Sequence, residues 1–206
     1  MSTASKLLEI AAGELGTKEY PADSNKVKYA SWYGMNGQPW CVMFVMWVFA
    51  QAGVALPTRT ASCTTLMEAA KRAGMWVTGN YKPGDVVIYD WGWDKKPDHC
   101  GIVKDVYTSG ITAIEGNTSY DDDSNGGEVM LRTRSNSQIL GAVRSVFEEE
   151  QVLDNVSKIN QENVDWMVKN GIMQGDANGD LKLSSPVTRD ALSAILRRYH
   201  DKFGGK

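Results

Sequence analysis

The stretch that decides the fold runs from residue 40 to residue 51 and reads Trp40-Cys41-Val42-Met43-Phe44-Val45-Met46-Trp47-Val48-Phe49-Ala50-Gln51. Apolar side chains cover every side of this segment, which is typical of a helix buried in a protein core. Gly53 follows and marks the end of the helix. Because the apolar run is too short to span a bilayer, we expect a central core helix and no membrane segment.

The segments on either side of this helix predict a mixed fold. We expect a surface helix over 4–15, a loop over 20–39 and a second helix over 62–73. Strand patterns follow at 86–89, 99–106, 111–115, 128–134 and 138–146. Helices followed by strands favour an α+β domain, in which the buried helix lies on an antiparallel sheet.

A charged break at 148–151, Glu-Glu-Glu-Gln, is the expected linker between two domains. It separates a larger domain, 1–147, from a small α-helical module, 152–206. The module shows two short apolar helix faces joined by a turn rich in Gly, Asn and Asp, and it is small for independent stability.

Composition excludes several classes of protein. The chain has 206 residues and a net charge of −3, and it contains no run of Lys or Arg, so we expect no nucleic-acid partner. Its start, Met-Ser-Thr-Ala-Ser-Lys, has no charged and apolar leader pattern. We therefore expect synthesis in the cytoplasm without a signal peptide, no membrane partner and no cofactor.

Three cysteines, Cys41, Cys63 and Cys100, stand at irregular spacing without a Cys-x-x-Cys pair. This pattern argues against a disulfide framework and against a structural zinc site. Cys41 lies in the first turn of the predicted core helix, where unpaired N–H groups and the helix dipole favour thiolate. The alternative is that Cys41 is a small core residue, and Cys63 and Cys100 are expected to be buried without a role.

Polar residues that could serve Cys41 begin and end neighbouring strands. His99 opens one predicted strand, and Glu115 ends the next. If the two strands pair, Glu115 can accept a ring N–H of His99 and fix its orientation, and Asn117 could assist. Taken singly, His99 and Glu115 could each be solvated. The other histidine, His200, is expected on the surface of the last helix.

The ordered blocks of the larger domain resemble the cysteine, histidine-dependent amidohydrolase/peptidase (CHAP) domain of phage endolysins and bacterial autolysins. These blocks are Asn25–Tyr29, Trp32–Gly34, Pro39–Cys41, Lys82–Val87, Asp98–Val103 and Ile114–Asn117. The resemblance implies a papain-like fold and hydrolysis of an amide in peptidoglycan. It also implies that Cys41 is the nucleophile, His99 the general base and acid, Glu115 the residue that orients His99, and Asn117 a supporting polar group.

The loop before His99 differs from that of many relatives, which carry an acidic loop that looks like a calcium site. Here Gly92 removes one potential ligand, and Lys95 and Lys96 add positive charge. We therefore expect no metal in the Asp90–Asp98 loop, since calcium needs six or more oxygen ligands. Trp40, Trp91 and Trp93 are the expected substrate contacts, and packing beneath the loop is the alternative for Trp91 and Trp93.

The C-terminal module resembles a single S-layer-homology repeat, with Thr188 as a helix N-cap. That resemblance implies binding to cell-wall polymers, and association with copies of the chain is the other role open to it. An EF-hand-like stretch, Asp176–Asp180, is rejected because Leu181 and Val187 stand where glycine and an acid are required.

The sequence therefore predicts a peptidoglycan hydrolase of the phage-lysin kind, an amidase or an endopeptidase, that acts on the cell wall after release. Another papain-like cysteine enzyme, such as a P60-type endopeptidase, and a wall-binding protein without activity are the alternatives.

Overall fold

The computed structural model describes residues 2–123, 125–148, 158–175, 179, 181 and 188–204, and no side chain of 158–161 is described. The chain forms two compact units, Met1–Glu149 and Glu150–Lys206. In the described residues, no helix is long and apolar enough to cross a membrane.

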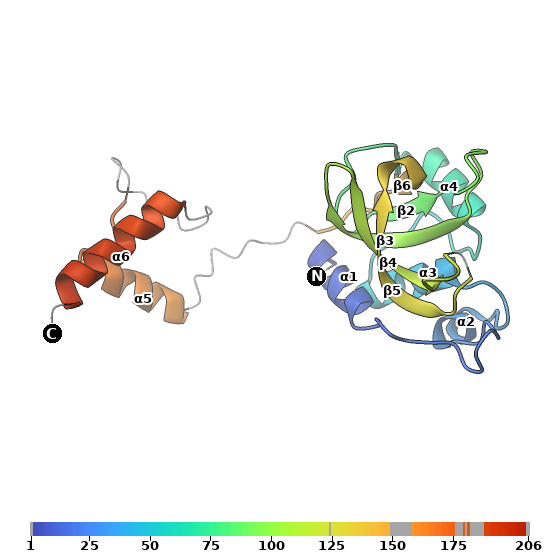
Figure 1. The fold of residues 1–206 in the computed structure, drawn as a ribbon, viewed down its shortest axis with the longest axis horizontal. Helices are drawn as coiled ribbons and strands as arrows, with labels where there is room; N and C mark the ends of the chain where they lie inside the picture. Colours follow the sequence, from blue (N-terminus) through green and yellow to red (C-terminus); the bar gives the residue numbers. More distant parts are fainter. Residues whose placement is uncertain are drawn as a thin grey trace. The chain divides into compact units, whose positions relative to one another are not determined.

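The larger unit is built on an antiparallel sheet (Figure 1). Across the described residues the sheet has six strands, in the order β1-β6-β2-β3-β4-β5. These are β1 (Trp76–Val77), β2 (Val86–Tyr89), β3 (His99–Val106), β4 (Gly110–Thr118), β5 (Glu128–Ser135) and β6 (Ile139–Val143), with a 3-10 turn, η1 (Asn136–Gln138), before β6. The register places Ile102 opposite Ile114, so the strands that begin with His99 and carry Glu115 are neighbours, as the sequence predicts.

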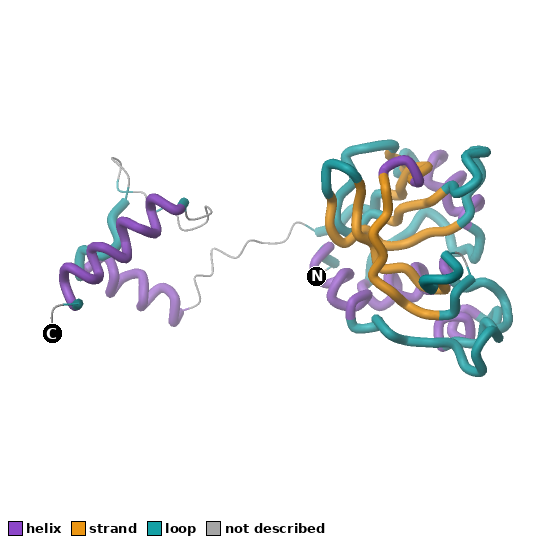
Figure 2. Tube along the Cα trace, viewed as in Figure 1, coloured by secondary structure: helices purple, strands orange, loops and turns teal. Residues whose placement is uncertain are grey.

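The helices of this unit are α1 (Ala4–Ala12), α2 (Lys28–Tyr33), α3 (Cys41–Ala52) and α4 (Cys63–Arg72). Figure 2 shows the helices and the strands of this unit in separate colours. Helix α3 packs against β3 and β4, and nearly all of its side chains are buried. It ends at Gly53, whose left-handed φ of 68° suits glycine. The predicted α+β class, with a buried helix on an antiparallel sheet, is confirmed.

Glycine allows α3 to approach β4 closely. A Cβ at Gly116 would lie 2.7 Å from the Cβ of Phe44 and 2.8 Å from the ring of Trp40. This packing fixes the start of α3 against the strand that carries Glu115. The opposite face of the sheet has a second, smaller apolar cluster, which consists of Val87, Tyr89, Val103, Ile111 and Ala113.

The elements differ from the sequence prediction in several places. Strand β4 continues past Glu115 to Thr118, and β6 ends at Val143 rather than at residue 146. The first helix ends at Ala12 rather than at residue 15. Residues 28–33, predicted as loop, form the short helix α2, which ends at Gly34 with φ 93°. The two-residue strand β1 was not predicted. Both α2 and β1 are too short to show a hydrophobic periodicity in the sequence. They form because α2 packs against α3 and β1 pairs with β6.

The smaller unit contains two described helices, α5 (Lys158–Lys169) and α6 (Arg189–Phe203). Thr188 caps α6 by accepting the N–H of Ala191, as predicted. The rings of Trp166 and Phe203 stack with centroids 5.8 Å apart, and Ile172 is buried. Most of the rejected EF-hand-like stretch (residues 176–178 and 180) and Val187 lie outside the described residues, as do residues 149–151 of the predicted linker.

Candidate active site

Cys41 is the first residue of α3. The preceding residue, Trp40, makes no side-chain cap, so the first N–H groups of the helix have no side-chain acceptor from it. These groups and the helix dipole place partial positive charge at the sulfur. The residue is 7% exposed. The sulfur is therefore held at the positive end of a buried helix.

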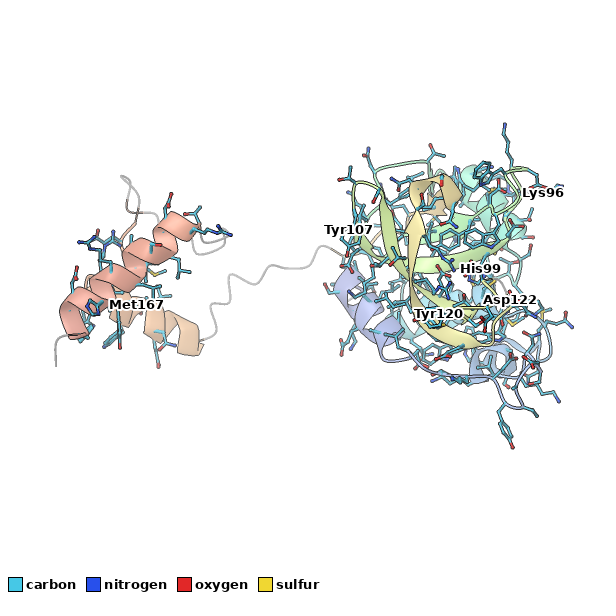
Figure 3. The ribbon with its side chains drawn as sticks, in the orientation of Figure 1. Lys96, His99, Tyr107, Tyr120, Asp122 and Met167 are labelled. Carbon is cyan, nitrogen blue, oxygen red and sulfur yellow. The ribbon has the colours of Figure 1, made fainter. Side chains whose placement is uncertain are left out.

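His99 is the first residue of β3 and is completely buried. It lies inside the larger unit, whereas Lys96 of the preceding loop lies at the edge (Figure 3). Its Nε2 atom is 3.3 Å from Oε2 of Glu115. Neither ring nitrogen makes a hydrogen bond of regular geometry with the described residues. Because Nε2 faces Glu115, Nδ1 is the nitrogen left for Cys41.

Glu115 is fixed by a buried arginine that the sequence analysis did not identify. Arg134, on β5, donates from Nε to Oε1 at 2.9 Å and from Nη2 to Oε2 at 2.6 Å. Both residues are buried. Nη1 of Arg134 also lies 3.0 Å from Oδ1 of Asp123. This two-pronged contact holds the carboxylate in one orientation toward His99. In the sequence, the contact between Arg134 and Glu115 is hinted at only by the alternation of Arg132 and Arg134 along β5.

An aromatic wall lines the other side of His99. The rings of Tyr89 and Trp91 stack 4.8 Å apart, and their centroids lie 6.1 and 6.4 Å from the His99 ring. The guanidinium of Arg134 lies 4.8 Å from the Trp91 ring. The imidazole therefore has little freedom to turn away from Glu115.

All three cysteines of the chain meet at this site. Cys63 is the first residue of α4, and Cys100 follows His99 on β3. The Sγ atoms of Cys41, Cys63 and Cys100 all lie within 4.8 Å of one another. The predicted burial of Cys63 and Cys100 is confirmed, and both lie beside Cys41, which their positions in the sequence do not indicate.

The electrostatics favour a thiolate at Cys41. Hydrogen bonds from Cys100 and Cys63 lower the pKa of Cys41 well below its ordinary value; burial opposes this shift, and His99 adds to it. Burial lowers the pKa of His99, but the polar contacts and charges of Cys41 and Glu115 outweigh burial and raise it to about 9. A thiolate–imidazolium pair is the protonation state that results.

The pKa values of Glu115, Cys100 and Cys63, which surround this pair, are shifted as well. Burial raises the pKa of Glu115, but Arg134 and His99 more than compensate and leave it lowered, so Glu115 is charged. Cys41, Cys63 and burial raise the pKa of Cys100 well above its ordinary value. The pKa of Cys63 is also raised well above its ordinary value. The contact with Cys100 lowers this pKa, but the effects of Cys41 and of burial are larger and raise it. Cys41 is therefore the thiol of the three that ionises most readily.

Asn117 occupies a strained position at the end of β4. It is buried, has a φ of 63°, and lies where the pairing of β4 with β5 shifts register. Its Nδ2 atom donates to Oδ1 of Asn125 at 3.1 Å. Left-handed backbone at a residue other than glycine is found often at functional sites. This contact links Asn117 to the loop before β5.

The three tryptophans differ in their environments. Trp40, an expected substrate contact, is completely buried, with its ring 5.5 Å from that of Tyr29. Trp40 instead packs the start of α3 into the core. Trp91 is half-buried on Tyr89, which is the packing alternative. Trp93 is 74% exposed and has a ring available to a ligand.

The acidic residues of the Asp90–Asp98 loop bond to the loop itself. Asp90 accepts the N–H groups of Asp94 and Lys95 at 3.3 and 2.8 Å. Asp98 accepts the N–H of Trp91 at 2.6 Å, and Asp94 pairs with Lys96 at 2.8 Å. These carboxylates therefore act as turn-forming groups.

A thiolate, an imidazolium and a fixed carboxylate in this order can perform nucleophilic acyl transfer. Two described cavities lie elsewhere: one of about 280 Å³ beside Trp32 and Arg59, and one of about 430 Å³ beside Tyr81 and Tyr107.

Comparison with known protein families gives a match that covers the residues of this site. The sequence model of the CHAP domain matches residues 32–117, a range that includes Cys41, His99, Glu115 and Asn117. The resemblance to that domain is confirmed for this range. No curated protein matches the chain.

Among solved structures, the chain is similar to Ly7917, with 16% identity and a TM-score of 0.43 over 69% of this chain and 62% of that one. It is also similar to a wild-type endolysin, LysIME-EF1, with 15% identity and a TM-score of 0.41 over 72% and 67%. The match thus spans less than two thirds of the length of Ly7917.

Proposed function

We propose that this protein is a peptidoglycan hydrolase that cleaves an amide bond with Cys41 as nucleophile. The observation that carries the proposal is the order of groups from Cys41 through His99 to Glu115 at the start of a buried helix. The CHAP-domain match over 32–117 supports it, because that family is defined by a cysteine and a histidine that hydrolyse amides.

In the first half of the reaction the Cys41 thiolate attacks the carbonyl carbon of the amide. The negative charge moves to the carbonyl oxygen, toward the N–H of Cys41, which has no intrahelical acceptor. His99 then gives its proton to the leaving nitrogen, and the C–N bond breaks. An amine leaves, and a thioester remains on Cys41.

In the second half, neutral His99 takes a proton from water, and the resulting hydroxide attacks the thioester. The C–S bond breaks, a carboxylic acid leaves, and Cys41 returns as thiolate beside protonated His99. Glu115 stabilises the imidazolium in both halves and stays ionised itself, since Arg134 holds its charge.

The smaller unit is proposed to hold the enzyme at the cell wall, as the resemblance to an S-layer-homology repeat implies. Peptidoglycan is a solid substrate, so a binding module raises the local concentration of the catalytic unit. A phage origin, with release to the wall at lysis, fits this arrangement. Self-association through the same unit is the competing role.

The decisive experiment is loss of turbidity of purified cell walls. We expect clearing by the wild-type chain and none by Cys41→Ala, with His200→Ala as a control because His200 is exposed on α6. Clearing that survives Cys41→Ala would rule out the nucleophile. Binding without clearing by the wild type would favour a wall-binding protein that lacks activity.

Products separate the finer alternatives. Mass spectrometry of the released fragments distinguishes an N-acetylmuramoyl-L-alanine amidase, which frees whole stem peptides, from an endopeptidase, which cuts within them. For the smaller unit, co-sedimentation with walls is compared between the full chain and a chain that ends at Glu149. Equal binding by the two would overturn the proposed tether.

A further inference from the structure

The three-cysteine cluster contains more thiols than the proposed reaction needs. Cys41 alone performs the covalent chemistry, yet Cys63 and Cys100 are brought to it from α4 and β3. The chain has three cysteines, and the sulfurs of all three lie within 4.8 Å of one another. The three thiols converge from three separate elements of the fold, α3, α4 and β3.

The spacing of the sulfurs suits one small, soft cation. Zinc binds thiolate sulfur at about 2.3 Å, which places the sulfurs of a tetrahedral site about 3.8 Å apart. Sulfurs already within 4.8 Å of one another need side-chain movements of about 1 Å or less to reach that geometry. Thiolate ligands select zinc and similar soft ions over magnesium and calcium.

Two helix N-termini meet at the cluster. Cys41 and Cys63 are each the first residue of a helix, so the positive ends of two helix dipoles lie at the cluster, where they favour metal-bound thiolate. His99 adjoins Cys41, and its Nε2 atom is 3.3 Å from Glu115. The described protein ligands of the site are therefore the three cysteine sulfurs, and the fourth position of a tetrahedral ion is left to a water molecule.

We propose that Cys41, Cys63 and Cys100 form a zinc-binding site, whose occupation removes the nucleophile from catalysis. Each thiol that coordinates the ion releases its proton, and the sulfur lone pair of Cys41 is then engaged by the metal instead of a carbonyl carbon. The binding site stands on the sulfur geometry alone, whereas the inhibitory consequence rests on the proposed function.

The test is titration of the metal-free full-length chain with Zn²⁺ by calorimetry, and with Co²⁺ by absorption spectroscopy, in a buffer free of thiols. We expect one ion per chain and a sulfur-to-cobalt charge-transfer band with the intensity of three thiolate ligands. Cys63→Ser and Cys100→Ser should each weaken zinc binding at least tenfold. His200→Ala, the matched control for adventitious imidazole binding, should bind as the wild type does.

The cobalt spectrum needs no variant, so it tests the site even where a buried Cys→Ser change fails to fold. A cobalt complex without the charge-transfer band, or equal zinc affinity in the wild type and in a folded Cys63→Ser or Cys100→Ser variant, would overturn the site. Zinc binding by a chain that never clears walls would support the site and remove only the proposed function. Clearing that stays unchanged at saturating zinc would overturn the inhibition.

Discussion

The side chain of Glu115 lies across the backbone of Gly101, where an added Cβ would come within 2.6 Å of the Glu115 Cγ. Gly101 is two residues after His99 on the neighbouring strand. Because Gly101 has no side chain, the carboxylate of Glu115 has room to reach the imidazole. This explains the glycine in the Asp98–Val103 block. The match to the CHAP domain thus includes a residue that acts through packing alone.

Gly101→Ala is therefore expected to displace Glu115 and to lower wall-clearing activity by at least tenfold. Crowding of this kind costs about 1–3 kcal/mol, so most of the chain should remain folded at room temperature. Gly79→Ala is the matched control, because a Cβ there meets nothing within 4 Å. Clearing rates and thermal melts of the two variants check the prediction; equal rates would show that Glu115 needs no such room.

Glu115→Gln should remove the charge that stabilises protonated His99. Glu115 is one of the groups that raise the pKa of His99 to about 9, so the alkaline limb of the activity profile should move to lower pH. The change also removes the buried carboxylate that pairs with Arg134 and leaves Asp123 as its described ionic partner, so the cost in stability is at most about 3–5 kcal/mol.

The double variant Glu115→Gln/Arg134→Met separates the two effects. It should recover much of the melting temperature, because no unpaired buried charge remains, while the shifted alkaline limb persists. Recovery of both properties would mean that Glu115 serves only to neutralise Arg134.

The pH dependence of activity follows from the thiolate–imidazolium pair. Cys41 is ionised above a pKa that lies well below its ordinary value of 9.0, and His99 stays protonated up to about 9. The reactive form therefore exists between these two pKa values and is lost as pH rises through about 9. Wall clearing and alkylation of Cys41 by iodoacetamide should both be measured across this range. Alkylation that begins only near pH 9 would show an ordinary thiol.

The same pair should contribute little pH dependence to stability. The raised pKa of His99 adds stability that is lost as pH rises from 6.5 to about 9, whereas the lowered pKa of Cys41 adds stability that is gained up to 9.0. Where the folded pair holds its one proton on His99 and the unfolded pair holds it on Cys41, folding changes the number of bound protons by none. The two contributions oppose each other, so thermal melts of the wild type should show no steep loss from this pair in that window.

Parts of this arrangement could be predicted from sequence because they depend on local pattern. The apolar run after Trp40 predicts α3, and strand patterns around His99 and Glu115 predict neighbouring strands, which the register of β3 and β4 bears out. The meeting of Arg134 with Glu115 depends on side-chain reach across β4 and β5, which no short spacing encodes.

The cysteine cluster escaped prediction for a similar reason. Metal sites are sought in sequence through short ligand spacings, and Cys41, Cys63 and Cys100 have none. Their convergence depends on where α4 begins relative to α3 and β3, which is a property of the whole fold. The burial of Trp40 was missed because an aromatic ring beside a nucleophile is equally consistent with packing and with substrate contact.

Replacement of Trp93 and of Trp40 by alanine should affect stability and substrate binding in different ways. Trp93 is 74% exposed, so Trp93→Ala is expected to keep the wild-type melting temperature and to weaken binding to cell walls or to soluble muropeptides. Trp40 is completely buried against Tyr29, so Trp40→Ala should cost about 3–5 kcal/mol of stability and reduce the yield of folded protein. Thermal melts and the KM and kcat for a soluble muropeptide measure both effects. A raised KM at unchanged melting temperature in Trp93→Ala supports a substrate contact, whereas an unchanged KM would leave Trp93 as a surface residue without a part in binding.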